Sequence, residues 1–223
     1  MKSNTMKKEL VTRSGGIQNE HFEEQAIMLK KLYFKYKARR IVIDGNGLGI
    51  GLLDYMVKSQ IDPATGDIYQ DFGILNDENG DYKKYRTSMT EQDAIYVIKA
   101  NAPINTEAHS NAQVQLTSGH VKFLIEEREA KSKLLGTKVG QAMTPEQRAE
   151  YLKPYTLTSI LKEEMMNLRE ENDGANIILK PANRGIKKDK FSAFEYGLYY
   201  IKKLEDTRKK KKKFNVKDFM FMN

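Results

Sequence analysis

The sequence contains no cysteine, and no apolar run in it approaches the roughly 20 residues that cross a membrane. Without cysteine there is neither a disulfide framework nor a thiolate metal site. The first ten residues lack the apolar centre of a signal peptide. We therefore expect a protein of a reducing, cytoplasmic compartment with no membrane partner.

Charge is the most pronounced compositional feature of the 223 residues. The chain has 38 Lys and Arg against 30 Asp and Glu, which gives a formal net charge of +8. A positive surplus suits a polyanionic partner, although composition alone indicates only a basic protein. The length is sufficient for one large domain or two small ones with a real core.

Strand and helix patterns alternate along the chain, which predicts the α/β class. Apolar residues at three- and four-residue steps predict helices over 22–36 and 156–171, and further helices are expected over 52–62, 106–118 and 191–204. Residues 126–154 have little apolar periodicity, but Pro145 and Pro154 bound one more expected helix, over 145–154. Runs of β-branched and aromatic residues predict strands over 40–44, 72–75, 94–100, 121–125 and 176–180. Residues 1–20 are expected to be a poorly packed or short-strand start, 21–206 the folded domain, and 207–223 a basic linker with an apolar tail.

Asp44 ends the most distinctive of these strands. Three consecutive β-branched residues, Ile41 to Ile43, precede it, and a glycine-rich turn follows at once. The acid is therefore expected at the carboxyl end of a strand, where open α/β sheets present their binding groups. Its carboxylate is either a ligand for a cation or the N-cap of the next helix.

A second acid, Asp189, precedes the final predicted helix. An acid in that position commonly caps free backbone N–H groups and meets the positive end of the helix dipole. Lys187, Lys188 and Lys190 surround it and would attract phosphates, leaving the carboxylate to hold a metal. If the two elements are adjacent, Asp44 and Asp189 could share two divalent cations about 4 Å apart, as in phosphodiester hydrolysis.

The other candidate ligands have weaker patterns. His21, His109 and His120 show no metal-ligand spacing and are expected to be surface or packing residues. Asp54 could support Asp44 from the following helix, but an exposed acid is the preferred interpretation. Asp93 could line the same cleft, but a capping role is preferred.

Three segments together resemble the nuclease domain of tailed-phage large terminase subunits. They are HFEEQA at 21–26, IDGNGLG at 43–49 and KDKFSAFEYG at 188–197, and the resemblance extends from about residue 20 onward. It implies an RNase H-like fold, a mixed sheet flanked by helices. It also implies cleavage of concatemeric double-stranded DNA during genome packaging with two divalent metals, Mg²⁺ or Mn²⁺. Asp44 and Asp189 match the second and third acids of the family's cluster.

The chain departs from the family pattern at its start. The family's opening strand carries an aspartate within an apolar run, and residues 1–20 contain none. No glycine-rich loop with a Gly-Lys-Ser/Thr ending, which would indicate the ATPase motor, occurs either. We expect a terminase nuclease domain without its N-terminal strand or strands and without the ATPase part: a fragment, a split gene product or a remnant.

The densest block of charge runs from Arg208 through Lys209, Lys210, Lys211 and Lys212 to Lys213. It is expected to be a solvated linker that binds nucleic-acid phosphates without sequence preference. The apolar tail that follows is interpreted as a docking peptide for the portal or another packaging component.

The sequence thus predicts a metal-dependent endonuclease acting on DNA in the cytoplasm of an infected or lysogenic bacterial host. Expected partners are an upstream terminase ATPase or nuclease fragment, the small terminase subunit and the portal. The alternative is a catalytically incomplete DNA-binding or packaging-assembly module.

Overall fold

The computed structural model describes residues 22–47, 49–80, 92–183 and 185–217, so the predictions for residues 1–20 and the apolar tail from 218 lie outside the described residues. The fold is mixed α/β. The N-terminal half consists of α2 (Phe22–Lys35), β1 (Ile41–Asp44), α3 (Gly49–Met56), β2 (Gln60–Ile61), β3 (Ile68–Tyr69), β4 (Phe72–Ile74) and β5 (Gln92–Ile98). The C-terminal half consists of α4 (Ala102–Thr117), α5 (Glu127–Leu135), α6 (Lys138–Ala142), α7 (Pro145–Met166), β6 (Leu168–Asp173), β7 (Asn176–Pro181) and α8 (Asp189–Lys217).

The central sheet contains three strands in the order β1-β5-β4. Both pairings are parallel, and Asp44 lies opposite Ile98 in the register. Parallel strands end at one edge of a sheet, so the ends of β1, β5 and β4 share an edge. In the described part of the chain, antiparallel pairing occurs in the two hairpins β2-β3 and β6-β7.

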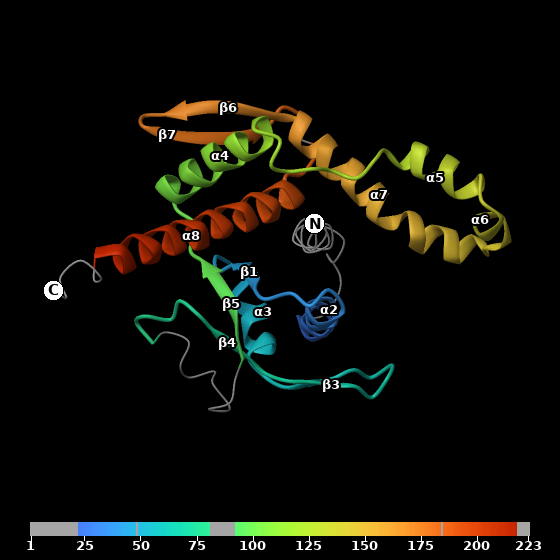
Figure 1. Cartoon of the computed structure of the whole chain (residues 1–223), viewed down its shortest axis with the longest axis horizontal. Coiled ribbons are helices and arrows are strands. Elements are labelled where there is room, and N and C mark those ends of the chain that lie inside the picture. Colours follow the sequence, from blue (N-terminus) through green and yellow to red (C-terminus); the bar gives the residue numbers. More distant parts are fainter. Residues whose placement is uncertain (1–21, 48, 81–91, 184, 218–223) are drawn as a thin grey trace.

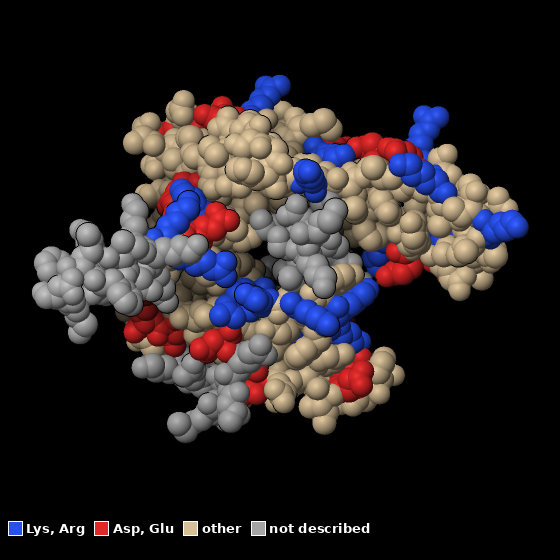
Figure 2. Space-filling model, viewed as in Figure 1, with Lys and Arg blue, Asp and Glu red and all other residues tan. Residues whose placement is uncertain are grey.

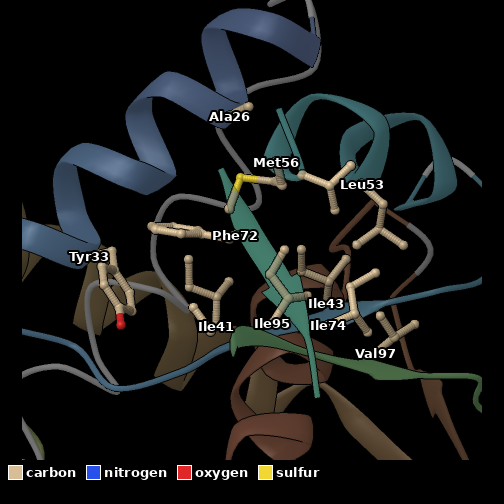
Figure 3. Packing of buried hydrophobic residues seen from close by; sticks show 12 residues of the cluster. Ala26, Tyr33, Ile41, Ile43, Leu53, Met56, Phe72, Ile74, Ile95 and Val97 are labelled. Carbon is tan, nitrogen blue, oxygen red and sulfur yellow. The ribbon is translucent and has the colours of Figure 1, made fainter. Parts of the chain in front are cut away.

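One face of the sheet forms the main core with α2 and α3. Ile41 and Ile43 are alternate residues of β1, so both side chains point to this face. They pack in one buried cluster with Leu53 and Met56 of α3. Phe72 of β4 is fully buried in the same cluster. Figure 3 shows these side chains interdigitating between the sheet and the two helices.

The opposite face of the sheet packs on α8. Val42 and Tyr96 point to this side and contact a cluster that includes Tyr196 and Tyr199 of α8. The rings of Tyr96 and Tyr200 pack in a tilted arrangement, with centroids 4.4 Å apart and an interplanar angle of 35°. Figure 1 shows α8 running between the sheet on one side and the layer of α4 and the β6-β7 hairpin on the other.

Helices α5, α6 and α7 form an arm that projects from this layered body (Figure 1). The capping box of Thr144 and Gln147 starts α7. Pro154 was expected to end a helix, but α7 continues through it to Met166. The missing N–H of Pro154 leaves the Glu150 carbonyl without its usual helical donor. The Thr158 hydroxyl donates to a different carbonyl, that of Pro154, at 2.7 Å.

Further predictions of secondary structure were wrong. The helix predicted over 52–62 ends at Met56, and Gln60–Ile61 form β2, which pairs with β3. Residues 121–125 form no strand. Instead, the side chains of Val121 and Phe123 pack against the cluster that includes Leu161 and Phe194. Residues 168–171 belong to β6 rather than to a helix, because all of β6 pairs with β7. The linker expected from residue 207 is helical as far as Lys217, which agrees with the good helix propensity of lysine.

Lys30 is a buried lysine within the N-terminal half. It is 0% exposed, and its ammonium donates to the carbonyl oxygens of Lys58 and, at 2.8 Å, Gln70. Desolvation by burial lowers the pKa of Lys30 to about 8, with Asp71 opposing the shift. The Lys30 side chain therefore links α2 by hydrogen bonds to the turn after α3 and to the segment before β4. Burial of its charge costs solvation free energy.

The pKa of Lys30 predicts a rise in stability with pH. Between about pH 8 and 10.5 the unfolded chain holds the Lys30 proton and the folded chain releases it, so alkalinity favours folding. From pH 7 to 10 the free energy of unfolding of the parent should gain about 2 kcal/mol relative to Lys30→Met. Urea titrations at three pH values measure this. Lys131→Met, an exposed control, should follow the parent, and parallel curves for the parent and Lys30→Met would contradict the assignment.

Candidate nucleic-acid and metal site

Asp44 lies where the sequence predicted, at the carboxyl end of β1, and it is exposed. Its Oδ1 accepts a hydrogen bond from the Asn46 N–H at 3.0 Å. The Asn46 side chain donates to the Ala100 carbonyl at 3.0 Å, and the Gly45 N–H donates to Ile98 O at 2.8 Å. The Asp44 carboxylate and these neighbouring hydrogen bonds therefore hold the turn between β1 and α3 in one conformation.

Glycines make this turn possible. Gly47 has φ of 58°, in the left-handed region that glycine favours. A Cβ on Gly49 would lie 1.7 Å from the carbonyl oxygen of Asp44, so no other residue fits there without displacing the backbone. The turn thus folds α3 tightly against the end of β1.

Tyr196 of α8 belongs to the buried cluster against which Val42 of β1 packs. Burial raises the pKa of Tyr196 to about 12, and the negative charges of Asp44 and Glu195 add to the shift. The Tyr196 hydroxyl donates to Asn105 Oδ1 at 3.0 Å, which joins α8 to α4. The strand end and the final helix, far apart in sequence, are therefore neighbours.

Asp189 is the first residue of α8 and is exposed. The cap of this helix comes instead from Glu164 at the end of α7, whose Oε2 accepts the Phe191 N–H at 2.9 Å. Glu164 Oε1 also accepts from Lys190 Nζ at 3.2 Å, and the glutamate is 3% exposed. Sequence reasoning missed Glu164, because nothing local distinguishes it from the acids around it on α7.

The two acids supply part of a metal ligand set. Tyr196 is seven residues beyond Asp189, which corresponds to about 10 Å along the helix axis. The convergence of Asp44 and Asp189 to within roughly 8 Å stays a prediction. Among the residues that the structure describes, no three His, Asp or Glu side chains are grouped to hold a metal ion. The remaining ligands of a two-metal site would be waters, substrate phosphate or groups from another chain.

The three lysines around Asp189 differ in their contacts. Lys187 is exposed, whereas Lys188 Nζ donates to the Leu179 carbonyl at 2.9 Å and Lys190 pairs with Glu164. Farther along α8, Arg208 and Lys209 are exposed. The side chains of Lys210, Lys211, Lys212 and Lys213 lie outside the described ones. Phosphate contact by all of these residues stays a prediction.

His109 is a packing residue, in agreement with the sequence. Its Nδ1 lies 2.5 Å from Glu195 Oε2, and both side chains are buried between α4 and α8. Burial raises the pKa of the Glu195 carboxyl, while His109 acts in the opposite direction. His120 is exposed, and His21 lies outside the described residues.

The interpretation of Asp54 as an exposed acid was wrong. The residue is half-buried on α3, and its Oδ1 is buried without a hydrogen-bond partner. Asp93 lies inside β5 rather than ahead of it, so it caps no element.

The surface around these elements carries both signs of charge. Figure 2 shows Lys and Arg side chains gathered near the middle of the drawn face, over the region where Figure 1 places α2 and β1. No helix in the described ranges is long and apolar enough to cross a membrane.

Glu164 should control the stability of the α8 start. Glu164→Ala removes the cap and leaves the Lys190 ammonium, 13% exposed, without its carboxylate. We expect a loss of about 3 kcal/mol in the free energy of unfolding, measured by urea denaturation. Glu171→Ala is the matched control, because its exposed pair with Lys180 should contribute below about 1 kcal/mol. Equal losses in the two variants would show that Glu164 is no cap.

Comparisons of the chain with protein-family models, with curated proteins and with solved structures find no match. The functional interpretation therefore depends on the motifs of the sequence and on the geometry of Asp44, Asp189 and α8.

Proposed function

We propose that this chain is the nuclease segment of a DNA-packaging terminase, with an RNase H-like fold and double-stranded DNA as its substrate. The observation that carries the proposal is the placement of Asp44 at the carboxyl end of β1, beside α8, the helix that Asp189 begins. The motif order of the sequence agrees with this arrangement. Its place of action would be the cytoplasm of a bacterial host.

Asp44 and Asp189 would hold Mg²⁺ or Mn²⁺, which would supply Lewis-acid stabilisation to a phosphodiester. The exposure of both carboxylates leaves them accessible to a ligand as large as DNA. The hydrogen bond from Asn46 orients the Asp44 carboxylate, and Glu164 fixes the helix start that bears Asp189. Lys187 would contact the phosphate backbone next to Asp189.

A second candidate function is DNA binding or packaging assembly without cleavage. It is favoured by the departure from the family pattern, since residues 1–20 contain no aspartate to match the acid of the family's opening strand. Cleavage would then require an acid from a complementing terminase ATPase or nuclease polypeptide. The small terminase subunit and the portal are the other proposed partners.

Nicking of supercoiled plasmid DNA separates the two functions. With Mn²⁺ or Mg²⁺ we expect the chain alone to cleave only slightly above an EDTA control, because a two-metal site short of one ligand binds metal weakly. Asp44→Asn and Asp189→Asn should remove that residual activity, and Asp173→Asn, on the exposed hairpin tip, should keep it. Robust cleavage abolished by Asp44→Asn would show that another acid completes the set, and equal activity in all variants would overturn the assignment of both aspartates.

DNA binding should persist without any metal. Each phosphate neutralised by Lys or Arg releases counterions, so log affinity falls linearly with log salt. Replacing the five lysines 209–213 with glutamine should reduce the magnitude of that slope by up to about 4 to 5, equally for unrelated duplexes. The matched control replaces them with arginine, which keeps the charge and should keep the slope. An unchanged slope in the glutamine variant would show that this block makes no phosphate contact.

A further inference from the structure

The connection between α2 and β1 has an unusual charge distribution. No acid occurs between Glu24 and Asp44, while the same stretch contains the bases Lys30, Lys31, Lys35, Lys37, Arg39 and Arg40. Lys30 is buried and Lys31 pairs with Asp62. The remaining four, Lys35, Lys37, Arg39 and Arg40, we name the basic corner.

The basic corner is at the surface. Lys35, Lys37 and Arg39 are exposed and Arg40 is half-buried. Several exposed or half-buried lysines elsewhere pair with acids, as in the pairs Lys162–Glu126 and Lys202–Glu107. By contrast, no described acid pairs with Lys37, Arg39 or Arg40.

The backbone of the basic corner is held in one conformation. The Ala38 N–H donates to Tyr33 O at 2.8 Å and the Lys37 N–H to Phe34 O at 3.2 Å, the two bonds of a Schellman helix end. Lys37 takes the left-handed position with φ of 50°, alone among the described non-glycine residues. Glycine fits that position with less strain. A cation therefore occupies a position where the fold alone would favour glycine.

The basic corner and Asp44 lie at opposite ends of the same strand. Asp44 is the fourth residue after Arg40, which corresponds to about 13 Å in extended backbone. Strand alternation assigns Arg40 to the face of Val42 and Asp44, the face that α8 contacts. In the described sheet β1 is the outer strand beside β5. The separation is close to the roughly 12 Å width of the major groove of B-DNA.

We propose that the basic corner is a second phosphate-contact surface, which binds one strand of a DNA duplex while the Asp44 end of β1 faces the other. This inference extends the proposed DNA-binding function and rests on it. The ligand chemistry is the phosphodiester backbone, read through charge and without base contacts. By binding one strand, the basic corner determines the position along the duplex at which the Asp44 end of β1 lies.

Fluorescence anisotropy of a labelled 20-base-pair duplex, titrated in EDTA at several salt concentrations, tests the surface without any metal. The variant Lys37→Gln/Arg39→Gln/Arg40→Gln should reduce the magnitude of the log–log salt slope by up to about 3. Its control removes the same charge from the arm, Lys131→Gln/Lys138→Gln/Lys153→Gln, and should keep the parent slope. Arg39→Lys/Arg40→Lys preserves the charge and should bind as the parent does.

Lys37→Gly separates binding from folding. Relief of the left-handed strain should leave the urea midpoint unchanged or raise it, while the affinity for the duplex falls. A structural role alone would move the midpoint without moving the affinity.

Two results would overturn this proposal. If the parent binds DNA and the triple glutamine variant keeps its affinity and slope, the corner contacts no phosphate, although the proposed function survives. If the parent binds no duplex at low salt, both the corner and the proposed DNA-binding function fail. The same holds if, in a parallel titration with vesicles rich in phosphatidylserine, the parent binds the vesicles and not the duplex.

Discussion

The position of α8 is the constraint on which the rest of the structure depends, and buried carboxylates fix that position. Glu164 caps the first turn of α8 from α7, and Glu195 in its second turn meets His109 of α4. A buried carboxylate costs free energy unless it is paired and hydrogen-bonded, so a shift of α8 by one turn would leave both groups without partners. These contacts therefore select one register among the many that an apolar helix face would accept.

That register joins the two halves of the chain. With α8 in place, Tyr196 is brought to the sheet beside Asp44 while its hydroxyl binds Asn105 on α4. Two hydrogen bonds attach the β6-β7 hairpin to neighbouring segments. The Ile177 N–H donates to Thr106 Oγ1 of α4, and Lys188 Nζ, just before α8, donates to the Leu179 carbonyl. The candidate site thus forms where the sheet edge meets α8, and it depends on residues from four separate elements.

Local patterns predicted the elements whose stability is mainly local. The period of α2, the β-branched run of β1 and the Asp173-Gly174 turn all correspond to elements in the structure. Prediction failed where distant partners decide, as for residues 121–125, which are held by side-chain packing without a strand neighbour. Glu164 was missed for the same reason, since its role depends on a helix start 27 residues away. The position of Asp44 was predicted correctly because a β-branched run followed by glycines marks the end of a strand within the local sequence.

Binding and cleavage make different demands on such a site. Phosphate contact depends on summed charge, tolerates errors of an ångström and is distributed over many residues. Hydrolysis at a two-metal site requires several oxygen ligands in fixed geometry, and the loss of one affects every step that depends on the ions. Among the described residues, the basic corner and the exposed Lys187 supply positive charge, and β1 and α8 position the acids Asp44 and Asp189. The proposed DNA contact would therefore depend only on summed positive charge, whereas the proposed cleavage would also depend on how many oxygen ligands gather around the two aspartates.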